Sequence, residues 1–319
     1  MENNQLLVSI VCITYNQEWF IRDCLNGFFT QKTNFQFEVL IHDDASTDNT
    51  ANIIREYEAK YPNIIQPIYQ TENQYSKGIN PGVEYLLPIA QGKYIALCEG
   101  DDYWTDPYKL QKQVDFLEAN PEYSLCFCKF QTLDQKTSKL QNDHNESLFV
   151  NGVERIEFDF ERFYLGWHIG TQTAIFRKDL YNKIDTLQYR YFRDIHLYTE
   201  LLLKGKGTCL NFFGAVYRKH TGGVYTGVSE LQNAKIGYLC YKEIYRKNKQ
   251  ENFLKLKYVK FAKYYINHLK KENNYFNAIL MEISVLPYQD KQDIMKFSKE
   301  IIFDILKAIK IKFKRTLQK

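Results

Sequence analysis

The sequence predicts an α/β protein, in which a mixed, mostly parallel β-sheet is flanked by helices and followed by a C-terminal helical extension. Up to about residue 130, apolar β-branched runs alternate with segments of helical periodicity, which is typical of βαβ units. After residue 229 the pattern is helical throughout and rich in Tyr, Lys and Leu. We therefore expect an α/β domain over residues 1–228 and a helical extension over residues 229–319.

Four strands are predicted in the first hundred residues. Residues 6–15 (LLVSIVCITY) form a near-continuous apolar run, which is typical of a strand buried on both faces. Further apolar runs predict strands at 35–41, 64–69 and 93–97. The helices expected between them cover residues 20–29, the segment after the capping residues Ser46 to Asp48, and residues 83–90, where Pro88 limits the length.

The second half of the α/β part is less regular. A helix is predicted at 107–120, with Pro107 at its first position and Asp106 as its cap. Residues 132–151 are polar and are expected to form a loop. The remaining predicted elements are strands at 124–130, 173–177 and 210–218 and a helix at 195–204.

Composition limits the function classes. The net charge of +4 is too small to indicate a nucleic-acid partner. Seven cysteines, none in a Cys-x-x-Cys pair, indicate reduced thiols. Residues 1–5 lack the basic stretch of a signal peptide, and no apolar run approaches the ~20 residues that span a bilayer. We therefore expect a cytoplasmic protein.

An acidic cluster follows the fourth predicted strand. Glu99, Asp101 and Asp102 lie within four residues, and carboxylates this close raise one another's pKa unless a cation or hydrogen-bond donors hold them. Oxygen ligands favour Mg²⁺ or Mn²⁺, and ligands of open α/β sheets bind beyond the carboxyl ends of strands. The cluster therefore predicts a metal site. The alternative is an acidic turn that only leads into a helix, although Asp106 already supplies that cap.

Polar residues also end two neighbouring strands. Asp43 and Asp44 follow the second strand, and Thr14, Tyr15 and Asn16 end the first. Carboxylates at such an edge can accept hydrogen bonds from a uracil-type base or from ribose hydroxyls. The alternatives for Asp43 and Asp44 are turn chemistry and a calcium loop, although the Gly that a calcium loop needs at its centre is absent. Together, the three groups favour a nucleotide-binding rim.

Three ordered motifs resemble those of the family-2 glycosyltransferases of GT-A fold. They are the opening VSIVCITYNQEWFIRDCLNGFFTQ, the base-binding strand FEVLIHDDASTDNT, and GKYIALCEGDDYW, in which Glu99 replaces the first Asp of the D-x-D metal motif. The resemblance covers roughly residues 6–225. It implies a GT-A (Rossmann-like) fold and inverting, Mg²⁺- or Mn²⁺-dependent transfer of a sugar from a nucleoside-diphosphate sugar, with UDP as the expected nucleotide.

The resemblance also implies roles for individual residues on the donor side. Thr14 and Asp44 would lie near the base and Glu99 near the ribose. Asp101 would hold the metal, with Asp102 beside it. The expected donor-binding residues are Thr14, Tyr15, Asn16, Asp43, Asp44, Glu99, Asp101, Asp102 and Arg218.

Residues 217–223 (YRKHTGG) resemble the loop that covers the diphosphate in this family. There, Arg218 or Lys219 would neutralise phosphate, and His220 would complete the metal shell beside Asp101. A lone His is more often a surface residue than a ligand. The acceptor side is expected at Trp167 and His168, with a core position as the alternative for Trp167.

Asp194 stands where the resemblance places the catalytic base, with Arg193 in the position of the family's Glu. The alternative role for Asp194 is a helix N-cap, and both roles are compatible. A carboxylate at this position would accept the acceptor's hydroxyl proton as it becomes acidic in the transition state.

The sequence thus predicts an inverting hexosyl- or N-acetylhexosaminyltransferase that acts on a glycan or lipid-linked acceptor in surface polysaccharide synthesis. One rival is a sugar nucleotidyltransferase, which would normally show a Gly-rich basic loop near the first strand, and residues 14–18 lack one. Another rival is a catalytically silent nucleotide-sugar-binding protein, which the departures at Glu99 and Arg193 support.

The C-terminal segment is amphipathic and basic. Residues 307–319 contain six Lys or Arg and no acid, and Ile301, Ile302, Ile305, Leu306, Ile309 and Phe313 fall on one helical face. This pattern suits peripheral contact with the inner face of an anionic membrane. The alternative is a helix that packs on the catalytic domain with a solvated basic face.

Overall fold

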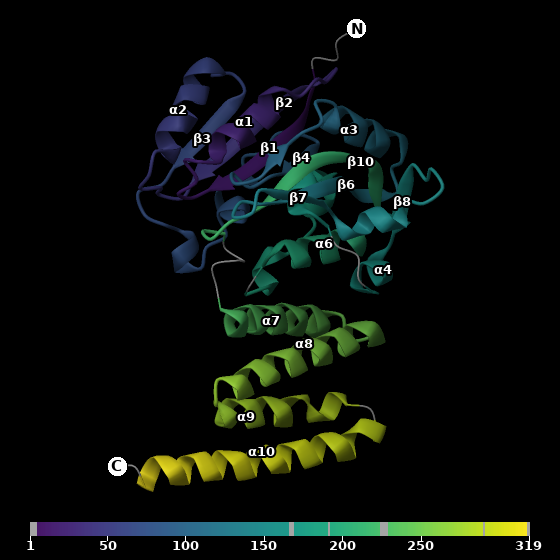
Figure 1. Ribbon diagram of the computed structural model, residues 1–319. Coiled ribbons are helices and arrows are strands. Elements are labelled where there is room, and N and C mark those ends of the chain that lie inside the picture. The colour runs from purple at the N-terminus through teal and green to yellow at the C-terminus, as the bar shows by residue number, and fades with distance from the viewer. Residues whose placement is uncertain (1–4, 166–168, 191, 224–228, 290, 318–319) are drawn as a thin grey trace. The chain divides into compact units, whose positions relative to one another are not determined.

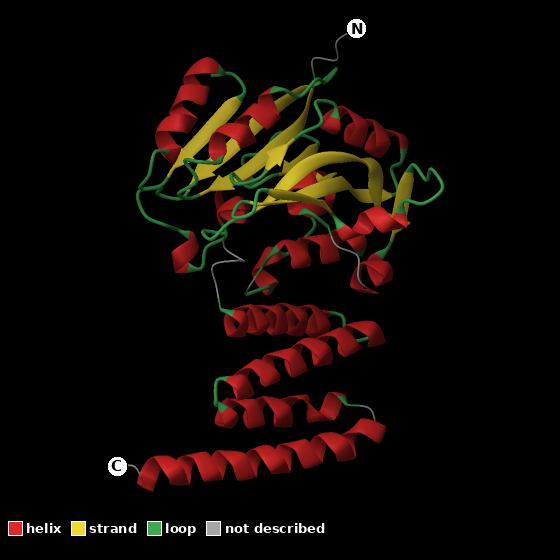
Figure 2. Cartoon of the chain, in the orientation of Figure 1, coloured by secondary structure: helices red, strands yellow, loops and turns green. Residues whose placement is uncertain are grey.

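The structure is a computed structural model, and it describes residues 5–165, 169–190, 192–223, 229–289 and 291–317 (Figure 1). The chain divides into two compact units, one of residues 1–188 and 197–221 and one of residues 189–196 and 222–319. The first unit combines a sheet with helices, and the second is helical (Figure 2). The predicted fold class, with helices at the C-terminus, is confirmed.

The first unit is built on one sheet, in the order β3-β2-β1-β4-β9-β6-β10-β5, with β7 added to β6 and β8 to β10. The strands are β1 (Leu6–Thr14), β2 (Gln36–Asp43), β3 (Ile65–Tyr69), β4 (Tyr94–Leu97), β5 (Tyr103–Trp104), β6 (Tyr123–Asp134), β7 (Lys139–Asn142), β8 (Arg155–Phe158), β9 (Ile175–Arg177) and β10 (Lys206–Lys219). Strands β3, β2, β1 and β4 are parallel, and β9 lies antiparallel between β4 and β6.

Helices cover both faces of this sheet. They are α1 (Ile21–Phe29), α2 (Thr50–Lys60), α3 (Lys109–Ala119), α4 (Phe160–Leu165), α5 (Lys178–Tyr181) and α6 (Asp194–Leu202), with a π-helical turn at Gly82–Leu86. Because strand side chains alternate between faces, Val8, Ile10 and Cys12 of β1 join the core formed with α1, α2 and α3. The side chains of Val11 and Ile13 lie against Gly82 instead. Burial on both faces explains the continuous apolar run of β1.

Three features of this unit differ from the predicted elements. Strand β6 continues to Asp134 and pairs with β7, so part of the segment 132–151 is a hairpin. Its second strand is exposed along its whole length and so carries no apolar pattern. Strands β5 and β8 are also unpredicted, because each is short and pairs only with β10. Helix α3 begins at Lys109, with Tyr108 at the N-cap position, so Asp106 lies two residues before the cap and its Oδ1 accepts from the Tyr108 N–H (2.8 Å).

The second unit stacks four helices in chain order (Figure 1). They are α7 (Glu230–Lys247), α8 (Asn252–Lys271), α9 (Tyr275–Val285) and α10 (Lys291–Leu317). Near the C-terminal end of α8, the Lys270 ammonium contacts the buried carboxylates of Glu282 on α9 (2.6 Å) and Asp304 on α10. Residues 189–196 belong here because the ring of buried His196 lies 3.5 Å from the Glu243 carboxylate of α7. Among the helices that the structure describes, none combines the length and apolar content of a membrane span.

Candidate functional site

Backbone hydrogen bonds bring the three predicted polar clusters to one edge of the sheet. The register of β1 and β2 sets Thr14 opposite Asp43, and the Asp44 N–H donates to the Thr14 carbonyl (3.0 Å). The Gly100 N–H donates to the carbonyl of Ile13 (3.0 Å). The ends of β1, β2 and β4 therefore form one continuous rim, as expected from parallel pairing.

Gly100 allows the segment after β4 to approach β1. A Cβ at this position would lie 2.8 Å from the Thr14 Cβ and 2.4 Å from the Gln17 Oε1. The Thr14 hydroxyl in turn donates to Gln17 Oε1 (2.7 Å). A side chain at position 100 would therefore push the acidic cluster away from the first strand, which is a requirement that the sequence motif alone does not reveal.

Asp101 and His220 meet at this rim. His220 directly follows β10, and its Nε2 lies 3.0 Å from Asp101 Oδ2. The ring of Phe20 packs on the imidazole, with 4.6 Å between the centroids. The other carboxylate oxygen of Asp101, Oδ1, is buried and has no hydrogen-bond partner in the structure. The pair therefore presents a buried acceptor oxygen and an imidazole nitrogen together.

Asp102 is fixed by β10, the strand that His220 directly follows. Its Oδ1 accepts from the Arg218 N–H (2.8 Å), and the side chain is 3% exposed. Burial, followed by the negative charge of Asp101, raises the pKa of the Asp102 carboxyl well above its usual value. Asp102 therefore links the acidic segment to β10 and sets the spacing between Asp101 and His220.

The Arg218 guanidinium turns toward α1. Its Nη2 pairs with the carboxylate of Asp23, and its Cζ lies 4.5 Å from the Tyr103 ring centroid and 5.1 Å from that of Phe20. The group is buried, and its Nε has no hydrogen-bond partner in the structure. Asp23, Phe20 and Tyr103 were not among the predicted site residues. They join the site because Arg218, near the end of β10, lies against the start of α1, and the sequence does not show this contact.

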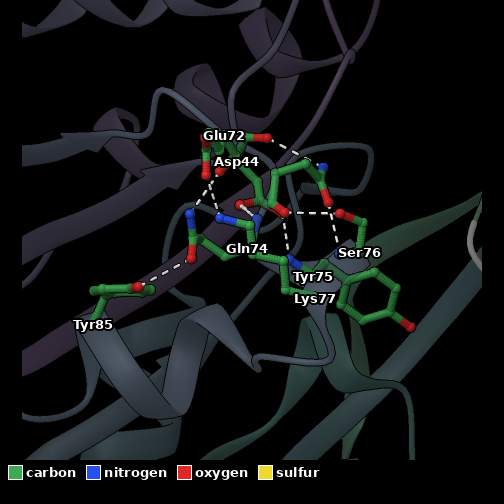
Figure 3. A network of polar contacts seen from close by, with 8 residues as sticks. Asp44, Glu72, Gln74, Tyr75, Ser76, Lys77 and Tyr85 are labelled. Carbon is green, nitrogen blue, oxygen red and sulfur yellow. Dashed lines mark hydrogen bonds and ion pairs between the residues drawn. The ribbon is translucent and has the colours of Figure 1, made fainter.

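Asp44 organises a loop that follows β3 (Figure 3). Its Oδ1 accepts from the Gln74 N–H (2.7 Å) and its Oδ2 from the Tyr75 N–H (3.0 Å). The Gln74 side chain continues the network, because its Nε2 donates to the Glu72 carbonyl (2.7 Å) and its Oε1 accepts from the Tyr85 hydroxyl (3.3 Å). Both oxygens of Asp44 are therefore engaged in holding the loop against the rim.

In contrast to Asp44, Asp43 uses only one of its carboxylate oxygens in a hydrogen bond within the structure. Its Oδ2 accepts from the Ser46 N–H (3.2 Å), whereas its buried Oδ1 has no hydrogen-bond partner in the structure. Burial raises the pKa of this carboxyl. Neighbouring His42 is fully buried, stacks on Tyr85 at 5.2 Å between centroids, and has its pKa lowered by burial. Of the two aspartates, Asp43 thus has the oxygen that can still accept a hydrogen bond from a ligand.

The remaining rim residues are more open. Asn16 adopts a left-handed backbone (φ 52°), and its Oδ1 accepts from the Thr47 N–H (2.7 Å), which fixes the turn after β1. The side chains of Tyr15 and Glu99 are exposed at the rim. The Glu99 carbonyl accepts from the Cys24 thiol (3.4 Å).

The donor set of the rim is compatible with a divalent cation. Asp101 and His220 supply a carboxylate and an imidazole, and Asp101 Oδ1 is an orphaned buried acceptor. Mg²⁺ and Mn²⁺ are commonly bound through one or two protein side chains together with phosphate oxygens of the substrate. Within the described ranges, no three His, Cys, Asp or Glu side chains gather into a cluster that would hold a metal by protein ligands alone.

Of the predicted base and acceptor residues, the structure describes the base Asp194 but neither acceptor residue. Asp194 is the first residue of α6, is exposed, and accepts from the Ile195 N–H through Oδ1 (2.8 Å). It belongs to the second compact unit. Its role as a base stays a prediction. Trp167 and His168 lie outside the described residues.

Comparison with protein families decides the class. The model of the family described as "Glycosyl transferase family 2" matches residues 9–185, which is more than half of the chain. The chain belongs to glycosyltransferase family 2. The matched range contains the ends of β1, β2 and β4, so these three strand ends of the rim lie within the part of this glycosyltransferase that matches its family, whereas Arg218 and His220 lie beyond it.

Relatives extend the likeness beyond the matched range. The chain is 37% identical over 219 residues to the uncharacterized protein Rv1520 of Mycobacterium tuberculosis, covering 68% of this chain and 60% of that relative's length. It is 28% identical over 273 residues to a putative teichuronic acid biosynthesis glycosyltransferase, TuaG, of Bacillus subtilis, covering 85% of this chain and 99% of TuaG.

A solved structure confirms the GT-A fold. The structure of TarS residues 1–349 from S. aureus, in complex with UDP-GlcNAc, superposes with a TM-score of 0.66 at 18% identity. The match covers 96% of this glycosyltransferase and 89% of that chain. At this identity the likeness concerns the fold.

Proposed function

We propose that this family-2 glycosyltransferase moves a hexosyl or N-acetylhexosaminyl unit from a UDP-sugar to its acceptor with inversion. The observation that carries the proposal is the contact between Asp101 and His220, which sets an orphaned buried carboxylate oxygen beside an imidazole at the edge of the sheet. A structural ion pair would need no orphaned oxygen, because a buried acceptor without a partner costs about 1–3 kcal/mol.

In this proposal the base and ribose of the donor lie along the ends of β1, β2 and β4. Asp43 Oδ1 is the acceptor that can receive the N–H of uracil. Asp44 acts through the loop that it holds at Gln74 and Tyr75. Glu99, which is exposed at the rim, would contact the ribose hydroxyls, and Thr14, Tyr15 and Asn16 would shape the floor of the site.

Asp101 and His220 would hold Mg²⁺ or Mn²⁺ against the diphosphate. The ion would supply Lewis-acid stabilisation of the leaving nucleoside diphosphate. Asp102 positions both residues through its bond to the Arg218 N–H. Arg218 supports this arrangement through its ion pair with Asp23, and its orphaned Nε would be a donor to phosphate.

Inversion requires a base on the face of the sugar opposite the leaving nucleotide. We assign this role to Asp194, whose exposed carboxylate begins α6, and the acceptor side to Trp167 and His168. Asp194 would take the hydroxyl proton of the acceptor as its oxygen attacks the anomeric carbon.

The acceptor in this proposal is a glycan or a lipid-linked glycan of surface polysaccharide synthesis. The likeness to TuaG over nearly its whole length supports this class. We assign catalysis to residues 1–228 and treat residues 229–319 as an extension, in a cytoplasmic protein that acts at the inner face of the membrane.

The test is donor binding by thermal shift and calorimetry, with UDP-glucose, UDP-galactose, UDP-GlcNAc and GDP-mannose, each with Mn²⁺ or with EDTA. A donor at 100 times its Kd stabilises the native state by ~2.7 kcal/mol, so a UDP-sugar should raise the Tm clearly and only with Mn²⁺. Asp101→Asn should abolish this shift. Asp115→Asn on α3, an exposed carboxylate that accepts from Gln111 as Asn also can, should keep it.

Three results would contradict the proposal. A metal-independent shift would remove Asp101 and His220 from donor binding. Donor binding without transfer or hydrolysis under any acceptor condition would favour a silent nucleotide-sugar-binding protein, and formation of a UDP-sugar from UTP and a sugar phosphate would favour a nucleotidyltransferase.

A further inference from the structure

Helix α10 has two distinct apolar faces, although its sequence pattern suggests a single one. Phe297 and Ile301 are buried in the core that α10 shares with Ile266 and Leu269 of α8 and Ala278 of α9. Asp304, one turn further on, is buried against Lys270. These residues form the packing face of the helix. Ile301, which the sequence pattern groups with the other apolar residues, therefore belongs to the packing face.

The second apolar face is exposed, and we call it the α10 stripe. Its residues are 37–73% exposed and consist of Ile294, Met295, Ile302, Ile305, Leu306 and Ile309. At about 100° per residue they fall within an arc of about 120° beside the packing face. They extend for about 22 Å along the helix at 1.5 Å per residue. Ser298 lies on the same arc between Met295 and Ile302, so the stripe has an apolar group at Ile294 and Met295 and a larger one from Ile302 to Ile309. This many large exposed apolar side chains on one arc are unusual on a surface that only meets water.

Lysines border the stripe on the side away from the packing face. Lys296, Lys299, Lys307 and Lys310 are exposed and follow the stripe in the next arc of about 80°, which they share with the exposed ring of Phe303. Glu300 is the exposed acid among the described side chains of α10 from Ile294 onward. The sequence beyond Lys310 adds four more basic residues and no acid. Thus α10 carries a covered face, an apolar face and a cationic face.

We propose that the α10 stripe docks on an anionic lipid bilayer, with its apolar side chains in the interfacial region and the lysines on lipid phosphates. An apolar row bordered by lysine is the pattern of helices that lie in the plane of a membrane surface. A second copy of the chain fits less well, because pairing two stripes would bring their lysine rows together. This docking is independent of the proposed sugar transfer.

The anchoring of α10 makes the docking surface a fixed one. The Lys270 ammonium joins Asp304 of α10 to Glu282 of α9, and both carboxylates are buried. Since α10 is already held by its packing face, it can present the stripe without refolding. The helical unit would therefore meet the membrane as a folded surface, in contrast to peptides that become helical only on binding.

The experiment is co-sedimentation of the full chain with vesicles of pure phosphatidylcholine and with vesicles containing 30% phosphatidylglycerol, without donor or metal. Binding to the anionic vesicles should exceed binding to the neutral ones by more than tenfold and should weaken with salt. Ile302→Ser with Leu306→Ser should reduce binding by at least about tenfold, because each substitution removes the favourable free energy of transferring an apolar side chain from water to the membrane interface. Lys299→Gln with Lys310→Gln should reduce it by about fivefold per lysine.

Leu256→Ser on α8, which removes an exposed apolar side chain of the same unit outside the stripe, is the matched control and should bind as the wild type does. Circular dichroism melting checks that each variant is folded. Absence of binding to anionic vesicles would overturn the proposal, as would equal binding by the stripe variant. A wild-type oligomer that dissociates in the stripe variant, seen by sedimentation velocity without vesicle binding, would instead identify the stripe as a contact between copies. None of these outcomes bears on donor binding, which is measured separately.

Discussion

His220 Nε2 lies 3.0 Å from Asp101 Oδ2, although the two residues are 119 positions apart in the chain. The contact exists because β10 runs parallel to β6 and ends beside β5, which directly follows the acidic segment. It places an imidazole on the one predicted metal ligand that retains an orphaned oxygen.

We expect His220 to contribute to the affinity of the site for Mn²⁺. In His220→Gln, Asp101 keeps a hydrogen-bonding neighbour, but the imidazole donor to the cation is lost. We expect the affinity for Mn²⁺ in the presence of UDP to fall by about 10–100-fold, with little change in Tm. Calorimetric titration of Mn²⁺ measures this, and an unchanged Mn²⁺ affinity would remove His220 from the metal shell.

Asp43 and Asp44 should separate into binding and structural roles. Asp43→Asn keeps an acceptor for the Ser46 N–H but can replace the orphaned oxygen with an NH₂ group, so UDP affinity should fall by about tenfold or more. Asp44→Asn leaves the Gln74 or the Tyr75 N–H without its acceptor, which should cost about 1–3 kcal/mol of stability. Calorimetry with UDP and thermal melting of both variants test this. The reverse pattern would assign the base to Asp44.

Gly100→Ala should disable the site through a steric effect. The added methyl would clash with Thr14 and Gln17 and displace the acidic segment, so we expect loss of transfer and a stability loss of about 1–3 kcal/mol. Gly78→Ala is the control, because Gly78 has φ +82° but no atom within 4 Å of a Cβ. The Gly78→Ala variant should therefore be less stable but should keep its transfer activity. Normal turnover in Gly100→Ala would show that the segment tolerates displacement.

Asp194→Asn should preserve donor binding and lower kcat by about 10²–10⁴-fold, because Asn cannot take the acceptor proton. Asn can still accept from the Ile195 N–H, so the Tm should change little. Steady-state kinetics with calorimetry of UDP binding measures both effects. Near-normal turnover would require another base.

His42 predicts a pH dependence of stability. Burial lowers its pKa in the folded state, so the unfolded chain binds more protons at this site below the ordinary pKa of about 6.5. Its contribution to stability is therefore present near pH 7.5 and is lost as the pH falls through 6.5 toward the folded pKa. In urea unfolding between pH 7.5 and 5, His42→Gln should lose less stability than the wild type. Parallel curves for the two proteins would exclude this contribution.

The elements that could be predicted from the sequence are those that produce a hydrophobic pattern within a contiguous segment. The run 6–15 became β1 almost to the residue, because burial on both faces demands continuous apolar side chains. Strand β5 has two residues and depends on β10, more than a hundred positions away, so no local pattern could reveal it.

For the site, residue types were predictable but their partners were not. Asp43 and Asp44 are adjacent and chemically alike, and only the course of the loop at Gln74 shows that Asp44 is engaged while Asp43 keeps a bare oxygen. Likewise, helical periodicity grouped Ile301 with Ile302, although coverage by α8 and α9 separates them. Contacts between distant segments decide such cases.

The ion pairs of Lys270 couple the unfolding of α8, α9 and α10. With Glu282 on α9 and Asp304 on α10 both held by one ammonium group of α8, detachment of α10 would leave two buried charges with altered partners. Shortening the chain before Asp304 would therefore remove more than a surface helix. The amide protons of α8 and α9 should then lose their protection from exchange together with those of α10, because the three helices open as one cooperative element.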